Sequence, residues 1–420
     1  MIDPVVRFQW TSGSSRMDEF GKEVQTTCYT DADQRRPYFI ILPAELEDED
    51  ELIGCTVLQR IWQYLSPDIQ TIKIDKNCLL ESISNDRPEE CWLESISDAR
   101  LPLLDSSPGL QNCPKVQYSK LVEVDRLEPF VDLMVHSDST DRQVIFKYNP
   151  CRPRFLWNEI HILQLLPSHP NIVPLDHIVL ADVEARILGF TTRFVKGGDF
   201  AKNKTRLFKV KWLQQLTDVL DYLHLEVGVA HGDIQPKNLL FDPETDNLQL
   251  IDFGMVSSAS EYCIQEDMDL TYFALYAIIT LDLELFPTLR SYDTAVLKDK
   301  PWPTNRKLDC EASQLRKHLD DWVKRRKETR KTGSQATIKK FPGSGRIEES
   351  ETLAWPELEL YDEEEEEDDA KAEEAERKRY KFPWRRPSYA EAYPERVSKK
   401  RQAPDSEAPD SPVLEKKPKA

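Results

Sequence analysis

Hydrophobic positions between residues 120 and 326 recur with the periods of strands and helices. Alternation predicts early strands, and a helix follows in which Leu156, Ile160 and Leu163 share one face and Pro167 ends the pattern. The predicted strands are 120–124, 131–135, 143–148, 187–195, 239–240 and 248–252, and the predicted helices are 155–166, 209–225 and 269–280. Strands come first and helices later. This order predicts an α+β domain with a small β-rich N-lobe over about 120–192 and a helical C-lobe over about 196–326.

The two flanking regions have different patterns. Residues 1–119 mix short apolar runs, such as RPYFIILPAEL and CTVLQRIWQYL, with turn-rich polar patches. They form an N-terminal extension, either a small α+β module or a decoration of the following domain. Residues 327–420 alternate an acidic block with Lys/Arg clusters and prolines, which predicts a disordered acidic/basic tail.

Composition narrows the classes of function. Charged residues make up 31% of the 420 residues and hydrophobic ones 40%, with 28 prolines, so part of the chain is expected to lack a core. A net charge of −19 argues against nucleic acid or a membrane surface as a partner. The most apolar stretch, 272–286, is too short to span a bilayer. Because no secretion signal begins the chain and the 8 cysteines lack C-x-x-C spacing, we expect an intracellular protein with reduced thiols.

Two motifs in the predicted helical lobe carry chemistry. The first is His231-Gly-Asp-Ile-Gln-Pro-Lys-Asn238, and the second is Asp252-Phe-Gly254 directly after a predicted strand. Phosphoryl transfer needs an acceptor held in line and metal ions on the phosphates, with little covalent help from the protein. Asp233 can orient an acceptor hydroxyl, while Asn238 and Asp252 offer oxygen ligands of the kind that Mg²⁺ prefers.

Together, in this order, the motifs resemble the H-R-D-x-x-x-x-N and D-F-G pair of protein kinases. The chain is therefore similar to a divergent member of the protein-kinase-like superfamily, with its bilobal α+β fold. The resemblance implies ATP and Mg²⁺ as cofactors. It makes Asp233, Lys237 and Asn238 catalytic residues, and Asn238 and Asp252 the metal ligands.

The upstream half of the domain extends this resemblance. Val144-Ile-Phe-Lys147 is similar to the kinase strand whose lysine holds the α- and β-phosphates, and Glu159 on the next helix is its implied ion-pair partner. Residues 192–199 resemble the hinge between the lobes. In this interpretation, Thr192 is the gatekeeper, the backbone of Arg193 and Val195 faces adenine, Asp199 lies near the ribose and Leu240 lies under the adenine.

The family also implies residues that support the catalytic loop, which corresponds to residues 231–238 in this chain. Asp269 resembles the aspartate that braces this loop from a buried helix, and it can equally cap the helix N-terminus. Leu163 and Phe253 are expected to stack with His231 in a hydrophobic column that links the lobes.

Departures from the kinase pattern affect the phosphate lid, the room for adenine, the substrate platform and the position of the catalytic lysine. Residues 120–146 contain no glycine, so Val124–Phe130 replaces the glycine-rich loop. Ile145 replaces a small residue, and Gly232 replaces the arginine that responds to phosphorylation. The segment from Asp252 to Asp269 is short and has no A-P-E. Gln235 occupies the position of a catalytic lysine, and Lys237 offers that charge instead.

Three hypotheses follow. The first is an ATP- and Mg²⁺-dependent phosphotransferase that acts on Ser/Thr hydroxyls of proteins, so its partners are ATP and a protein substrate. The second is a pseudokinase that scaffolds a protein partner, and the third is a small-molecule kinase. In addition, the basic clusters 399–401 and 416–419 are typical of a bipartite nuclear import signal, which predicts a cytoplasmic or nuclear location.

Overall fold

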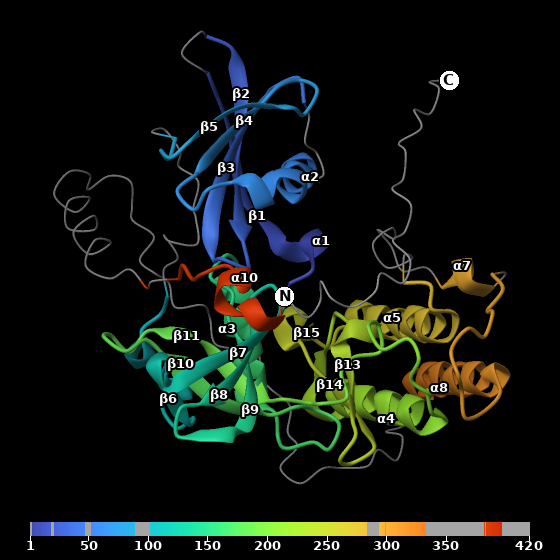
Figure 1. Cartoon of the computed structure of the whole chain (residues 1–420). Helices are drawn as coiled ribbons and strands as arrows, with labels where there is room; N and C mark the ends of the chain where they lie inside the picture. The colour runs from blue at the N-terminus through green and yellow to red at the C-terminus, as the bar shows by residue number, and fades with distance from the viewer. Residues whose placement is uncertain are drawn as a thin grey trace, which may run out of the picture. The chain divides into compact units, whose positions relative to one another are not determined.

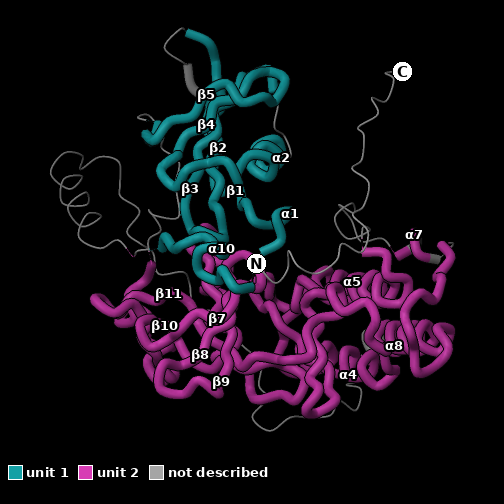
Figure 2. Tube along the Cα trace, in the orientation of Figure 1, with its two compact units in different colours: residues 1–93, 383–420 teal, residues 94–382 magenta. Residues whose placement is uncertain are grey.

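The computed structural model describes residues 2–17, 21–46, 52–88, 101–283, 294–298, 300–332, 382 and 384–396. The chain divides into two compact units, shown in Figure 2. Unit 1 combines residues 1–93 with residues 383–420, and unit 2 consists of residues 94–382. Within the described residues, no helix is both long and apolar enough to cross a membrane.

Unit 1 is built on a five-stranded sheet in the order β1-β2-β3-β4-β5. Its elements are α1 (Pro4–Arg7), β1 (Phe8–Met17), β2 (Glu23–Asp31), β3 (Arg36–Pro43), α2 (Leu52–Ile61), β4 (Thr71–Ile74), β5 (Leu80–Ser84) and α10 (Tyr389–Ala392). Strand β4 runs parallel to β3, so α2 forms the crossover between them (Figure 1). Gly54 allows close packing of α2 on the sheet, because a Cβ atom there would lie 2.3 Å from the Tyr29 ring.

Residues 384–396 join unit 1 through hydrogen bonds to the turn between β2 and β3. Arg386 donates from Nε to the Asp33 carbonyl and from a terminal nitrogen to the Ala32 carbonyl, at 2.7 and 3.0 Å. The amide of Tyr389 donates to the Asp33 carboxylate at 2.9 Å. Within the predicted tail over 327–420, residues 384–396 thus have defined contacts, with partners more than 300 positions earlier in the sequence. Residues 327–332 continue a helix that begins at Ala312. Most of the remaining tail lies outside the described residues.

Unit 2 begins with a sheet-rich lobe. Its elements are β6 (Lys115–Gln117), β7 (Leu121–Glu128), β8 (Val131–His136), β9 (Ser139–Lys147), α3 (Pro153–Leu165), β10 (Leu175–Leu180) and β11 (Ile187–Arg193). The six-stranded sheet has the order β6-β10-β11-β9-β8-β7. Residues before 120 also belong to this lobe, since the amide of Leu104 bonds the Ala185 carbonyl at 2.8 Å. Unit 2 thus begins earlier than the predicted boundary at residue 120.

Alternation on β9 explains which side chains face the site. Val144, Phe146 and Tyr148 are fully buried, while Ile145 and Lys147 on the opposite face are only partly buried. Helix α3 starts with Pro153, a residue favoured at the first helical position, and buries Leu156, Glu159, Ile160 and Leu163 on one face. These two local patterns direct Lys147 and Glu159 toward each other.

The second lobe of unit 2 is mainly helical, and Figure 1 shows α4, α5 and α8 on the other side of the unit from strands β6–β11. Its elements are α4 (Val210–Asp221), a π-helical turn (Tyr222–Val227), β12 (Val229–Ala230), β13 (Leu239–Asp242), β14 (Asn247–Leu250), β15 (Ser257–Ser258), α5 (Glu261–Thr280), α7 (Ala295–Lys298) and α8 (Ala312–Thr332). Short 3-10 turns at Pro236–Asn238 and Phe253–Met255 hold the two motifs. The predicted bilobal α+β fold is confirmed.

Candidate active site

The lobes are joined by an ion-pair cluster centred on Lys147. Its Nζ lies 2.6 Å from Glu159 Oε2 on α3 and 2.6 Å from Asp252 Oδ1. The other oxygen of Glu159 accepts the amide hydrogen of Phe253 at 3.2 Å. The structure therefore brings together three residues that sequence analysis assigned to phosphate and metal binding.

Electrostatics in this cluster follow from burial and pairing. Burial opposes the charge of Lys147, but the carboxylates of Glu159 and Asp252 outweigh it and raise the lysine pKa. Burial also acts to raise the pKa of Asp252, but Lys147 outweighs this effect, so the pKa is lowered. For Glu159 burial wins, and its pKa is raised although Lys147 partly compensates. Asp252 is thus held as an anion, the form that a metal ligand requires.

Asp233 lies in the loop between β12 and β13 and accepts two side-chain amides. Asn238 donates from Nδ2 to Oδ2 at 2.7 Å, and Gln235 donates from Nε2 to Oδ1. Asn238 also donates to the Asp233 carbonyl at 2.8 Å, which closes the loop. Gln235 therefore contacts Asp233 directly. Lys237 is exposed, and its charge helps to lower the pKa of Asp252.

A buried aspartate on α5 holds the catalytic loop from beneath. Asp267 accepts the amide hydrogens of His231 and Gly232, both at 2.7 Å. It is fully buried, and it also contacts His224 Nε2 at 2.8 Å. The expectation that Asp269 has this role is wrong. Asp269 is half-buried on another side of the helix, and it accepts a hydrogen bond from Gln265 at 2.9 Å.

Sequence analysis missed Asp267 because it placed the helix start too late. Helix α5 begins at Glu261, where Ser260 caps it by accepting the Cys263 amide, so position 267 lies inside the helix. A signal was present in the sequence. Asp267 shares a helical face with the buried residues Leu270, Thr271 and Ala274, and an acid on an apolar face needs hydrogen-bond partners.

The histidine that supports Asp267 has a defined tautomer. A terminal nitrogen of Arg326 on α8 lies 3.1 Å from His224 Nδ1. Because an arginine can only donate, Nδ1 accepts and Nε2 carries the proton that Asp267 receives. Arg326 also lies 3.3 Å from the Asp221 carboxylate. The support of the catalytic loop therefore continues into α4 and α8.

Gly232 is required by the backbone. It has a φ of 77°, and a Cβ atom there would lie 2.6 Å from the Met255 carbonyl oxygen. An arginine, which kinases have at this position, does not fit this geometry. The loss of that residue is thus linked to close contact between the catalytic loop and the turn after Asp252.

Phe253 joins the two motifs through an aromatic contact. It is fully buried, and its ring centroid lies 4.8 Å from that of His231 in an edge-to-face arrangement. Leu163 belongs to the same hydrophobic core. The expected contact between Phe253 and His231 is present, and His231 also contacts the Ile251 carbonyl through Nε2 at 3.1 Å.

The predicted hinge, residues 192–199, begins with the last two residues of β11. Thr192 pairs with Ile145 across the sheet, so their side chains share the face of Lys147. Arg193 donates to Asp242 at 3.0 Å. Val195 is buried, and its carbonyl accepts the Gly198 amide hydrogen at 3.4 Å.

The end of the hinge packs on β13. Asp199 forms a backbone bridge with Leu240, and its Oδ1 accepts the amide hydrogens of Ala201 and Lys202 at 2.8 and 2.7 Å. Asp199 thereby caps a turn. Leu240 is partly buried beside it. The structure thus places the two residues expected near the ribose and the adenine next to each other.

The lid over the expected phosphate position is a tight hairpin. Glu128 pairs with Val131, which leaves only Pro129 and Phe130 in the turn between β7 and β8. Phe130 has a φ of 60°, a value usually adopted by glycine, and its buried ring packs against Tyr148 at 5.6 Å. Side chains thus occupy the turn that glycines form in kinases.

Comparison with known proteins identifies this fold. The model of the protein kinase domain family matches residues 140–274, which contain the Lys147 cluster and both motifs. The chain contains a protein-kinase-like domain. The match begins within β9, after the hairpin that lacks glycine, and it ends within α5.

Several kinases resemble this domain over part of their length. CBL-interacting serine/threonine-protein kinase 5 of Arabidopsis thaliana is 37% identical over 115 residues, which cover 26% of this chain and 24% of that kinase. Casein kinase II subunit alpha' of Saccharomyces cerevisiae is 34% identical over 116 residues, covering 27% and 33%. CBL-interacting protein kinase 5 of Oryza sativa is 40% identical over 114 residues, covering 26% and 23%. The chain spans a third or less of the length of these relatives.

Proposed function

We propose that unit 2 is an ATP- and Mg²⁺-dependent phosphotransferase of protein-kinase type that acts on Ser/Thr hydroxyls. The observation that carries this proposal is the closed cluster of Lys147, Glu159 and Asp252. The cation that would hold the α- and β-phosphates contacts the carboxylate that would hold the metal. One of the similar proteins is named a serine/threonine-protein kinase and another a casein kinase, and both names support a protein substrate.

The residues have distinct roles in this reaction. Asp233 orients the acceptor hydroxyl and accepts its proton, and Lys237 supplies positive charge beside the transferred group. Mg²⁺ would be held by Asp252 and by the side-chain oxygen of Asn238, and when bound it neutralises charge on the phosphates. The hinge residues and Leu240 receive the adenosine.

Label transfer from ATP tests the proposal. The full chain is incubated with Mg²⁺ and γ-labelled ATP, alone and with a panel of Ser/Thr peptides. We expect label on serine or threonine, and we expect Asp252→Asn to reduce transfer at least about 100-fold. Asp138→Asn, the same change at an exposed turn residue, serves as the control. Absence of transfer to every acceptor, or equal transfer by Asp252→Asn, contradicts the proposal.

A scaffolding pseudokinase is the second candidate, and the lid favours it. The Pro129–Phe130 turn lacks glycine, and both oxygens of Asp233 already accept amide hydrogens. Thermal unfolding separates the two functions. The scaffold hypothesis predicts no rise in Tm with ATP and Mg²⁺, whereas the phosphotransferase predicts a rise that Asp252→Asn removes.

A small-molecule kinase is a third candidate, favoured by the short segment after Asp252. This segment contains a 3-10 turn and β15, and α5 begins already at Glu261. Little chain is therefore present to bind a peptide. Transfer of label to metabolites but not to peptides would support this function over the first.

We also propose nuclear import through the basic clusters 399–401 and 416–419, which lie outside the described residues. Import receptors recognise such Lys/Arg clusters. Removal of the residues after Val397 is expected to shift a fluorescent fusion toward the cytoplasm. An unchanged distribution contradicts this proposal.

A further inference from the structure

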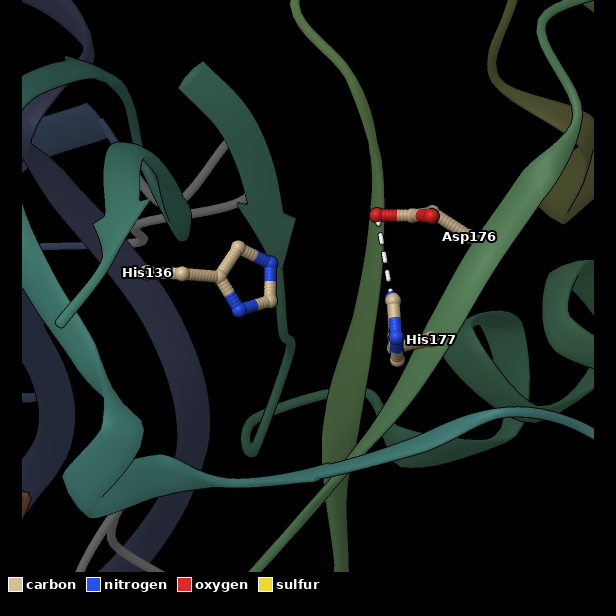
Figure 3. Close-up of side chains that lie close together, drawn as sticks. All are labelled: His136, Asp176 and His177. Atoms are coloured by element: carbon tan, nitrogen blue, oxygen red, sulfur yellow. Dashed lines mark ion pairs between the residues drawn. The ribbon is translucent and has the colours of Figure 1, made fainter. Parts of the chain in front are cut away.

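Two histidines and an aspartate converge in the sheet-rich lobe of unit 2, apart from the candidate active site. His136 ends β8, and Asp176 and His177 are consecutive residues of β10. One ligand atom from each lies within 4.8 Å of the others. Figure 3 shows the two imidazoles and the carboxylate facing one common space.

A β-bulge explains how two neighbouring residues of one strand reach the same site. Consecutive side chains of a regular strand point to opposite faces. In β10, Leu175 pairs with Thr192 and His177 pairs with Thr191, so Asp176 is the extra residue of a bulge. The bulge turns Asp176 toward its neighbour, and Asp176 Oδ2 lies 3.1 Å from His177 Nδ1.

Neighbouring residues hold the cluster in place without separating its side chains. Arg142 on β9 pairs with Oδ1 of Asp176, the oxygen that does not face His177. Thr191 Oγ1 accepts the amide hydrogen of His177 at 3.1 Å and lies 3.4 Å from Asp176 Oδ2. These contacts fix the carboxylate and the backbone of the bulge.

His136 provides the observation that points to a ligand. Its Nε2 atom is buried, and within the described residues it has no hydrogen-bond partner. Its ring centroid lies 5.5 Å from that of His177. A buried imidazole nitrogen without a partner loses its hydrogen bond to water, and a bound cation would compensate for that loss.

We propose that His136, Asp176 and His177 bind a transition-metal ion of the Zn²⁺ type. Two imidazoles and one carboxylate are a ligand set for Zn²⁺ and similar ions, whereas Mg²⁺ prefers oxygen ligands alone. Tetrahedral Zn²⁺ with bonds of about 2.0 Å holds its ligands about 3.3 Å apart, so small rotations of these side chains complete three positions. Water supplies the fourth.

The site has a structural role and is separate from phosphoryl transfer. Val131, at the start of β8, pairs with Lys147, whereas His136 ends the same strand. At about 3.3 Å per residue, this separates the metal site from the lysine by roughly 16 Å along the strand. Strands β8 and β10 are not neighbours in the sheet, because β9 and β11 lie between them. A metal ion would therefore cross-link the hairpin end to β10 and stabilise the lobe.

Titration of the full chain with Co²⁺ and Zn²⁺ tests this inference. The titration contains no nucleotide, and excess Mg²⁺ occupies carboxylate sites. We expect one tight equivalent, with a Co²⁺ spectrum typical of nitrogen and oxygen ligands and without a thiolate band. His136→Gln and His177→Gln should each weaken binding at least about 10-fold. His318→Gln is the matched control, since His318 contacts Thr217 on α4, away from the cluster.

The outcomes are decisive in either direction. Loss of the tight equivalent in His136→Gln, with retention in His318→Gln, supports the site. If His177→Gln does not fold, His136→Gln alone decides, because a substitution at the end of the β8–β9 hairpin should leave the fold intact. Wild-type affinity in His136→Gln, or a thiolate band in the Co²⁺ spectrum, overturns the proposal. Neither result depends on phosphotransferase activity.

Discussion

Lys147 Nζ lies 2.6 Å from Asp252 Oδ1, so the cation of the sheet-rich lobe is paired with the first residue of the D-F-G motif. The same nitrogen lies equally close to Glu159 on α3. Strand β9, the helix α3 that follows it, and the turn at Asp252, which lies 105 positions after Lys147, therefore meet at one charge. The stability of unit 2 and its proposed chemistry both depend on this pairing.

Replacement of Lys147 by Met should destabilise unit 2 by about 2 kcal/mol at neutral pH, because it leaves the buried carboxylate of Glu159 and the partly exposed carboxylate of Asp252 without their cation. Chemical denaturation of both proteins measures the difference. Lys237→Met, the same change at an exposed lysine, should alter the free energy of unfolding by less than about 0.5 kcal/mol. Equal stability of wild type and Lys147→Met would show that the cluster contributes nothing to folding.

The difference between wild type and Lys147→Met should depend on pH. Asp252 has a lowered pKa, so its stabilisation is present above its ordinary value of 3.8 and is lost as the pH falls through the folded value. Lys147 has a raised pKa, so its contribution is complete below 10.5 and is lost only as the pH rises through its higher folded value. Glu159 acts in the opposite direction, because burial raises its pKa. Its protonation as the pH falls favours the folded state and offsets part of the stability that is lost at Asp252.

Denaturation curves across this range test that relationship. The wild-type advantage should be largest between the two ordinary pKa values and should shrink below pH 3.8. A difference that is constant from acid to neutral pH would contradict the proposed ion pairing.

Asp267→Asn should lower the stability of unit 2 by about 2–4 kcal/mol and reduce phosphotransfer. Asn has one acceptor oxygen, whereas Asp267 accepts two backbone amides and the proton of His224. The matched change Asp269→Asn, two residues later, should be nearly neutral. Denaturation and label transfer on both variants measure the contrast. A larger effect at Asp269 would restore the assignment made from sequence alone.

Lys237→Ala should lower kcat about 10- to 100-fold with little change in the KM for ATP, because its charge acts near the transferred group. Gln235→Lys in that background should restore part of the rate. Gln235 contacts Asp233 Oδ1, so the amine of a lysine at position 235 would also lie near Asp233 and the transferred group. Steady-state kinetics distinguish the two parameters. A rise in KM alone would make Lys237 a binding residue.

Removal of residues 382–420 should destabilise unit 1, because Arg386 and Tyr389 then no longer bond the turn at Asp33. Arg386→Ala should cost about 1–3 kcal/mol, since two carbonyls lose their donor. Hydrogen exchange at the turn between β2 and β3 measures this loss. Truncation after Arg396 keeps every described contact and is the control. If hydrogen exchange at this turn stays slow in the protein that lacks residues 382–420, residues 384–396 do not stabilise unit 1.

Local patterns in the sequence determined much of the site. The spacing of Asp233 and Asn238 places both in one loop, where they bond each other. Alternation on β9 and the helical period of α3 orient Lys147 and Glu159. The periods of strand and helix predict these elements and the faces of their side chains, whereas the pairing of Lys147 with Glu159 was expected from the resemblance to protein kinases.

Only the tertiary structure decided the remaining features. A helix start eight positions earlier than predicted made Asp267, and not Asp269, the support of the catalytic loop. A β-bulge brought Asp176 to the face of His177, and a segment near the C-terminus returned to the turn at Asp33. These features are either contacts between residues that are distant in the sequence or shifts in the position of an element. Local periodicity predicts neither of them, because long-range packing determines both.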